Sequence, residues 1–249
     1  MIPWFNITLP MEELLLTQRD LIGLVLSYGY AFGLLFIVEG IGRRMAWPQY
    51  LTRKLVHIGA GMWIWGILLL FDTWTIGLIP FASFILLNYL FYRYQLFKTM
   101  DAADSSPGTV YFAISITLLF ALLWRSRGPV DRVPVAAAAV MAMTWGDGLA
   151  SIVGQRAGRH GYTAFGHGRS WEGTITMGVA SFVAIAATLL LLPNSSLSPL
   201  SAPLSVGAAL LMALVGALVA TAAEGLSPAG TDNLTVPLLS GLALALFTL

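Results

Sequence analysis

"VPVAAAAVMAMTWGDGLASIV" runs from residue 133 to residue 153 and contains one ionisable side chain, Asp147. An apolar run of this length matches the roughly 17 to 25 residues that a helix needs to cross a bilayer. Polar and apolar residues do not alternate along it, which favours a helix over a membrane-spanning strand. The stretch therefore predicts a transmembrane helix that carries an aspartate between two glycines.

The rest of the chain has the same character. It has 249 residues, of which 57% are hydrophobic and 10% are charged, against roughly 25% charged residues in soluble domains. Seven further apolar segments cover approximately residues 21–39, 55–71, 74–92, 109–124, 173–192, 204–223 and 234–249. We predict an all-α, polytopic transmembrane helical bundle of about eight helices, or seven if the short last segment does not cross. Residues 1–249 are expected to form a single integral membrane domain.

Composition also excludes some functions. The chain has no cysteine, which rules out disulfides and thiolate zinc sites. Its net charge of +1, without a basic stripe, argues against nucleic acid as a partner. The first apolar segment follows acidic residues and no small-residue cleavage site, so we expect neither a signal peptide nor a transit peptide.

The orientation follows from the lysines and arginines, because short cytoplasmic loops carry the excess of positive charge. With the N-terminus outside, nine of the thirteen cations face the cytoplasm: Arg43, Arg44, Arg53, Lys54, Arg93, Lys98, Arg156, Arg159 and Arg169. The other four face outward: Arg19, Arg125, Arg127 and Arg132. We expect a prokaryotic cytoplasmic (inner) membrane, with the active site on the cytoplasmic side.

Four ionisable residues lie within or at the ends of the predicted spans: Glu39, His57, Asp147 and Glu224. Such groups cost on the order of 2.5 to 3.5 kcal/mol on insertion scales, and in this topology all four lie at the cytoplasmic end. Glu39 has Arg43 one turn away and can reach the interface. Asp147 is too short to do so. Gly146 and Gly148 remove side chains beside it, as a closely approaching ligand would require.

The loop after Asp147 suits a polyanion. "GQRAGRHGYTAFGHGRSWEGT", residues 154–174, contains three arginines and six glycines. An ordinary cytoplasmic loop explains the arginines but not the glycines, which suggest a flexible backbone around an anion. Ser170 can cap the following helix, and a helix N-terminus with free N–H groups binds anions.

Two further groups complete a possible phosphate and metal site. Arg53 and Lys54 can share one helical face with His57, which could hydrogen-bond a phosphate or transfer a proton. Glu224 and Asp232 flank a turn on the cytoplasmic side. If their helices adjoin that of Asp147, the carboxylates suit Mg²⁺, which binds one or two carboxylates together with substrate phosphates. The soluble phosphate-binding motifs are missing from the sequence.

Four motifs resemble the membrane family of phytol kinase and dolichol kinase: "RKLVHIGAG" (53–61), "WGDGLASIVGQRAG" (145–158), "GRSWEGT" (168–174) and "DNLTVPLLS" (232–240). The family is related more distantly to phosphatidate cytidylyltransferase. The resemblance implies a multi-helix kinase that uses CTP or another nucleoside triphosphate with Mg²⁺ to phosphorylate a long-chain isoprenoid alcohol such as phytol. The chain departs from the family pattern at Arg169, where we expect lysine, and at Thr231, where we expect an acid beside Asp232.

The residues and the resemblance together give three sets of candidate site residues. The catalytic candidates are Asp147, His57 and Lys54. The nucleotide and phosphate candidates are Arg53, Lys54, Gly146, Gly148, Arg156, Arg159, Arg169, Ser170, Trp171, Glu172 and Asn233. The metal candidates are Asp147, Glu224 and Asp232.

Two other functions fit parts of the pattern. A cytidylyltransferase would join CTP to a lipid phosphate with the same cations and metal. A transporter or channel would place its ionisable residues near the middle of the membrane, whereas here they gather at one end. The expected partners are a nucleoside triphosphate, a lipid alcohol and membrane lipid. The chain is a monomer or a homodimer, and we expect the small pair Gly29 and Gly33 to serve packing within the monomer.

Overall fold

Helices dominate the computed structural model, which describes residues 15–96, 107–126, 130–164, 167–228 and 230–248. The helices are α1 (Gln18–Arg44), α2 (Gln49–Leu70), α3 (Trp74–Tyr94), α4 (Gly108–Leu123), α5 (Val133–Met141), α6 (Gly148–Ala157), α7 (Trp171–Leu191), α8 (Val206–Leu226) and α9 (Asp232–Leu246). A π-helical turn, η2 (Ala142–Asp147), joins α5 to α6. The described residues thus form eight helical spans, which confirms the predicted all-α bundle.

Six of these spans are long and apolar enough to cross a membrane, among the residues that the structure describes. The helices α4 and α9 are shorter. The joined span from Val133 to Ala157 is the most enclosed, because it packs against α2, α4, α7 and α9. Its alanines at 136 to 139 are fully buried, and such small residues let neighbouring helices approach closely in membranes.

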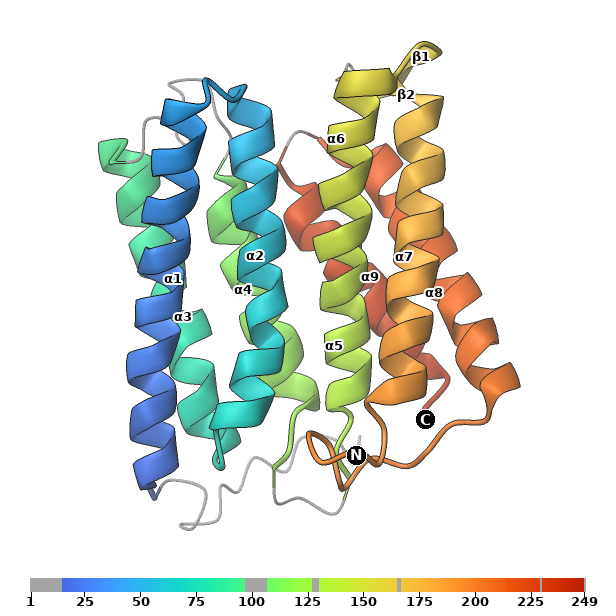
Figure 1. Ribbon diagram of the computed structural model, residues 1–249. Coiled ribbons are helices and arrows are strands. Elements are labelled where there is room, and N and C mark those ends of the chain that lie inside the picture. The colour runs from blue at the N-terminus through green and yellow to red at the C-terminus, as the bar shows by residue number, and fades with distance from the viewer. Residues whose placement is uncertain (1–14, 97–106, 127–129, 165–166, 229, 249) are drawn as a thin grey trace.

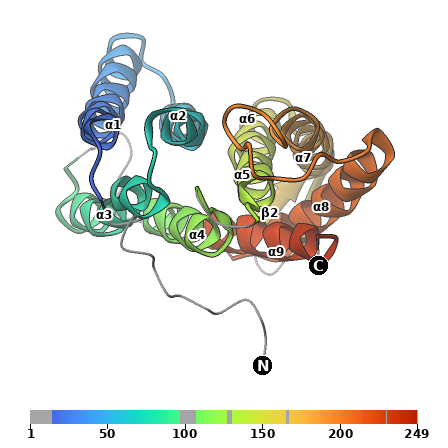
Figure 2. The same ribbon diagram turned by 90° about the horizontal axis from the view of Figure 1, so that it is seen from below.

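The helices divide into two groups (Figures 1 and 2). The helices α1 to α4 lie on one side and α5 to α9 on the other, with α4 beside α9 where the groups meet. The described cations among those counted as cytoplasmic lie at the upper end in Figure 1, where α1 and α3 end and α2 and α7 begin. Lys98 and Arg127 lie outside the described residues. The side of the membrane that this end faces stays a prediction.

The glycine-rich loop is more ordered than predicted. It contains an antiparallel hairpin, β1 (Gly161–Ala164) and β2 (His167–Ser170), in which Tyr162 pairs with Arg169. Gly154, Gly158 and Gly173 allow the end of α6 to approach the start of α7, since a Cβ on Gly158 would lie 2.8 Å from Oγ of Ser170, the N-cap of α7. The small size of these glycines serves packing, and a flexible backbone around an anion stays a prediction.

The pair Gly29 and Gly33 also differs from expectation. A Cβ on either glycine would meet no atom of the described residues within 4 Å. Packing within the monomer therefore does not explain this pair, since both glycines lie on an open face of α1.

Candidate active site

The π-helical turn places Asp147 inside the bundle. The carboxylate side chain is 5% exposed, although it sits in a helix that otherwise carries apolar side chains. A π turn changes the direction of the side chains that follow it and is frequent at functional sites. The flanking glycines serve packing: a Cβ on Gly146 would lie 2.1 Å from Ser181 Oγ, and one on Gly148 would lie 2.7 Å from Ile58 Cγ1. Gly146 and Gly148 do not line the polar pocket described below, and their contact with the nucleotide stays a prediction.

Asp147 is paired with a cation from α2. The Lys54 ammonium donates to Asp147 Oδ2 over 2.6 Å. His57, one turn further along α2, places Nε2 3.6 Å from the same oxygen and 3.1 Å from the Met143 carbonyl oxygen. Because both neighbours of Nε2 are acceptors, we assign the proton of the neutral ring to Nε2, which leaves Nδ1 as an acceptor. The three catalytic candidates thus lie together.

A second ion pair links the hairpin to the end of α8. The Arg169 guanidinium pairs with Glu224 and donates from Nη2 to the Ser227 carbonyl oxygen over 2.9 Å. Both charged side chains are largely buried, with exposures of 14% and 12%. The Arg169 Nε atom is buried and has no hydrogen-bond partner. Ser170 caps α7, as predicted, by accepting a hydrogen bond from the Gly173 N–H.

The start of α9 brings an acid and an amide to the same place. Asp232 Oδ1 accepts from both the backbone N–H and the side-chain Nδ2 of Asn233. The Asn233 Oδ1 atom is buried without a hydrogen-bond partner, which is costly unless a ligand supplies a donor. Asp232 and Asp147 are near enough to interact electrostatically.

These groups line one polar pocket of about 660 Å³, within the usual range for small-molecule sites. Eight of the predicted site residues line it: Arg53, Lys54, Asp147, Arg169, Ser170, Glu224, Asp232 and Asn233. They come from α2, η2, the hairpin, α8 and α9, which the fold brings to one end of the bundle. His57 lies just outside this pocket.

Four predicted residues between positions 156 and 172 are also absent from the pocket wall. Arg156, in the last turn of α6, and Arg159, just after that helix, are both exposed. Glu172 accepts a hydrogen bond from His160 Nδ1 over 2.7 Å. Trp171 is 56% exposed and lies against Tyr162, with the ring centroids 5.1 Å apart. These four side chains flank the hairpin and do not line the polar pocket, so their contacts with phosphate stay a prediction.

Other wall residues were missed. Ser151 and Gln155 line the pocket from α6, together with His167 and Thr174. Ser151 and Gln155 follow Asp147 at successive intervals of four residues, so the helical period alone was enough to place all three on one face. His167 had no comparable signal, since its position depends on the hairpin.

The acidic residues fit a metal only in part. No group of three His, Cys, Asp or Glu side chains in the described ranges could hold an ion by itself. Asp147 and Asp232 both face the polar pocket, whereas Glu224 is engaged by Arg169. This donor set matches Mg²⁺ that arrives with a nucleotide, because that ion needs one or two carboxylates besides water and phosphate.

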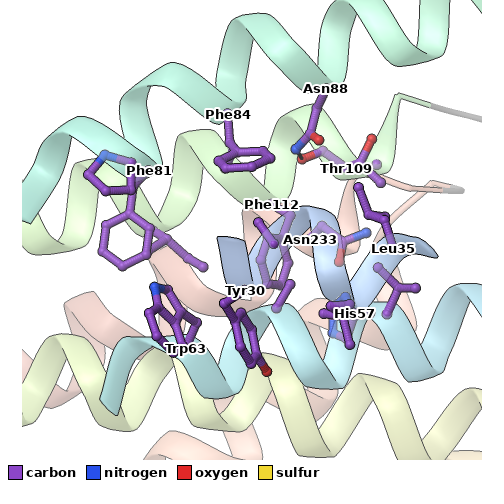
Figure 3. A pocket seen from close by; sticks show the side chains of 18 of the residues that line it. Tyr30, Leu35, His57, Trp63, Phe81, Phe84, Asn88, Thr109, Phe112 and Asn233 are labelled. Carbon is purple, nitrogen blue, oxygen red and sulfur yellow. Dashed lines mark hydrogen bonds between the residues drawn. The ribbon is translucent and has the colours of Figure 1, made fainter. Parts of the chain in front are cut away.

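A second, apolar pocket adjoins the polar one (Figure 3). It lies among α1, α2, α3 and α4 and is lined largely by aromatic and aliphatic side chains. Arg53, Lys54 and Asn233 belong to the walls of both pockets, and His57 lines the apolar one. A polar ligand and an apolar ligand can therefore meet at these residues.

Known kinases of lipid alcohols are similar to this chain in sequence. A phytol kinase from Synechocystis sp. is 35% identical over 226 residues, which cover 87% of this chain and 88% of that protein. A chloroplastic farnesol kinase from Arabidopsis thaliana is 30% identical over 243 residues, covering 88% of this chain and 75% of that protein. A probable chloroplastic phytol kinase 2 from Oryza sativa subsp. japonica is 30% identical over 241 residues, covering 89% and 74%.

No family model and no solved structure matches the chain. The relatives and the helical bundle define a class of alcohol phosphotransferases with membrane-spanning helices. Within that class, the chain belongs to the phytol kinase family.

Proposed function

We propose that the protein transfers the terminal phosphate of CTP to the hydroxyl group of a long-chain isoprenoid alcohol, with Mg²⁺. The observation that carries this proposal is the junction of a polar and an apolar pocket at Arg53, Lys54 and Asn233. A triphosphate in the polar pocket and a lipid chain in the apolar pocket would meet there. The names of the phytol and farnesol kinases support the lipid-alcohol acceptor.

The residues suggest how the reacting groups are held. Arg53, Lys54 and Arg169 provide positive charge along the wall of the polar pocket, and phosphoryl transfer depends mainly on alignment and charge stabilisation. The alcohol oxygen attacks the terminal phosphorus, and the bond to the nucleoside diphosphate breaks. His57 Nδ1 is assigned to accept the alcohol proton, because Nε2 faces the Met143 carbonyl oxygen. The unpartnered Asn233 Oδ1 would orient the hydroxyl before transfer.

Asp147 and Asp232 are the proposed ligands of Mg²⁺. When bound with the nucleotide, the ion would neutralise negative charge on the phosphates. Glu224 is assigned instead to holding Arg169, with which it forms an ion pair. The proposed location is the cytoplasmic face of a prokaryotic inner membrane, where CTP is available to the polar pocket.

A double-label assay tests this function. Purified protein in detergent receives farnesol or phytol with CTP labelled either in the terminal phosphate or in the base, with ATP as a comparison. We expect lipid-extractable label from the phosphate only, and loss of transfer when Mg²⁺ is chelated. Base label in the lipid fraction, with a lipid phosphate as acceptor, would instead establish a cytidylyltransferase. No label in lipid with any alcohol would rule out the proposal.

A further inference from the structure

The second pocket is mainly apolar, but polar side chains gather at one of its ends. Figure 3 shows Trp63 and Phe81 toward one end, and His57, Thr109 and Asn88 toward the other. The residues that the pocket shares with the polar pocket, Lys54 among them, lie at the His57 end. The pocket therefore has the polarity of a lipid alcohol, with one polar end and one long apolar part.

Polar atoms along the apolar part are already satisfied within the protein. The Tyr30 hydroxyl donates to the Gly59 carbonyl oxygen over 2.8 Å. The Trp63 indole Nε1 donates to Ser27 Oγ over 3.0 Å. A ligand in this part of the pocket therefore meets carbon surface and gains little from hydrogen bonding. The buried Asn233 Oδ1 lacks a partner and attracts a hydroxyl donor to the other end.

The Trp63 end is closed by packed side chains. Ile64 and Ile67, which follow Trp63 on α2, are fully buried. Phe81 packs edge-on against Phe120, with centroids 5.2 Å apart, and Phe120 packs against Trp124 at 5.8 Å. These contacts form a floor that a ligand cannot pass without displacing core side chains.

The dimensions fit one hydrocarbon chain. Ten residues of α2 separate Arg53 from Trp63, which corresponds to about 15 Å along the helix axis. The cavity volume is about 150 Å³, against about 660 Å³ for the polar pocket, and this smaller space favours one hydrocarbon chain over two.

We propose that this pocket binds the hydrocarbon chain of the acceptor alcohol and that the aromatic floor at Trp63 and Phe81 limits the chain length. This inference rests on the proposed function, since it places the acceptor beside the phosphate site. It predicts a single-chain prenyl alcohol as acceptor and no phosphorylation of diacylglycerol. Trp63 is then a specificity-determining residue, because its ring stacks on Tyr30 at 4.2 Å and occupies the end of the pocket.

The test compares Trp63→Ala with Trp65→Ala. Trp65 lies two residues away on α2 and is not part of the pocket wall. Its replacement by alanine therefore removes the same side-chain volume from the same helix without changing the pocket. The kcat/KM values are measured for geraniol, farnesol, geranylgeraniol and geranylfarnesol. We expect Trp63→Ala to shift the ratio toward the longer alcohols by roughly tenfold, since small changes in a hydrophobic pocket alter discrimination by 10- to 200-fold. Trp65→Ala should leave the ratio unchanged.

A second variant works in the opposite direction. Ala60→Phe fills the pocket one turn above Trp63 and should disfavour the longer alcohols while geraniol is still phosphorylated. Melting in detergent identifies any variant that has not folded. A uniform change for all alcohols in both variants, or an equal shift in Trp65→Ala, would overturn the inference even if the wild type is active.

A binding experiment separates failure of this inference from failure of the proposed function. A farnesol analogue with a diazirine at the end of its chain is irradiated with the wild type, without nucleotide. Crosslinks at or beside Trp63 and Phe81 would support the pocket even if no kinase activity is found. Crosslinks confined to the lipid-facing side of α1 or α7 would contradict it.

Discussion

At the residue scale, the site is a set of buried charges with assigned partners. Asp147 is neutralised by Lys54, and Glu224 by Arg169. Asp232 accepts hydrogen bonds from the backbone and side-chain N–H groups of Asn233 and has no salt bridge within the described ranges. A buried charge pair is stable only while both members are present. Such paired groups can exchange their protein partners for a metal and phosphates with little additional cost in free energy. This property suits a site that must also be stable without a ligand.

This arrangement predicts different roles for two acids of the same pocket. Asp232→Asn should raise the Mg²⁺ concentration for half-maximal activity by about tenfold or more, as loss of groups around a metal does. Glu224→Gln should leave that concentration unchanged and raise the KM for CTP, because Arg169 loses its partner. Magnesium titrations of purified variants check both. An equal increase in the Mg²⁺ requirement for the two variants would show instead that Glu224 is a metal ligand.

At the element scale, the π-helical turn is the feature that the sequence did not predict. The run from 133 to 153 predicted a helix, and the helix is present, but nothing in its periodicity showed that Ala142–Asp147 would widen. The turn depends on contacts from other helices, such as Ser181 of α7 against Gly146. The hairpin escaped prediction for a similar reason, because its strands are four residues each and the glycines suggested a flexible loop.

The packing role of the glycines makes a prediction at this scale. Gly146→Ala should lower the stability by about 1 to 3 kcal/mol, the usual result of overpacking a core, and should reduce activity by displacing Asp147. Gly29→Ala is the matched control, because nothing described lies within 4 Å of its Cβ position. Alanine there should be neutral or stabilising by up to about 1 kcal/mol. Thermal unfolding in detergent measures both, and equal stability of the two variants would contradict the packing role.

At the scale of the whole molecule, the sequence predicted the gathering of charges more reliably than their contacts. The apolar segments and the cation count placed Asp147, Arg169, Glu224 and His57 at one end, and the structure brings all four there. Asp147 could be chosen from one sequence because it interrupts an apolar run. The direction of each side chain could not be predicted from the sequence. Arg156 and Arg169 look alike there, and only the folded hairpin places Arg169 in the wall of the polar pocket. The apolar pocket also depends on how α1 to α4 pack.

The orientation of the bundle is testable because the chain has no cysteine of its own. Arg159→Cys and Val130→Cys place single thiols at opposite ends, both on exposed positions. In intact spheroplasts, an impermeant maleimide should label position 130 at once and position 159 only after permeabilisation. The reverse pattern would place the polar pocket outside. The Arg159→Cys protein should keep near-wild-type activity, because Arg159 does not line the pocket.

The most direct test of the account compares Asp147→Asn with Asp72→Asn. Asp72→Asn is the matched control, because Asp72 is also a paired aspartate but lies at the other end of the bundle. It forms an ion pair with Arg19 at 3.1 Å. Transfer of the terminal phosphate of CTP to farnesol is measured for both folded proteins in detergent. The account predicts a loss of about a hundredfold or more for Asp147→Asn, as when a preorganised charged group is removed from an active site, and near-wild-type transfer for Asp72→Asn. Full transfer by a folded Asp147→Asn protein would contradict it.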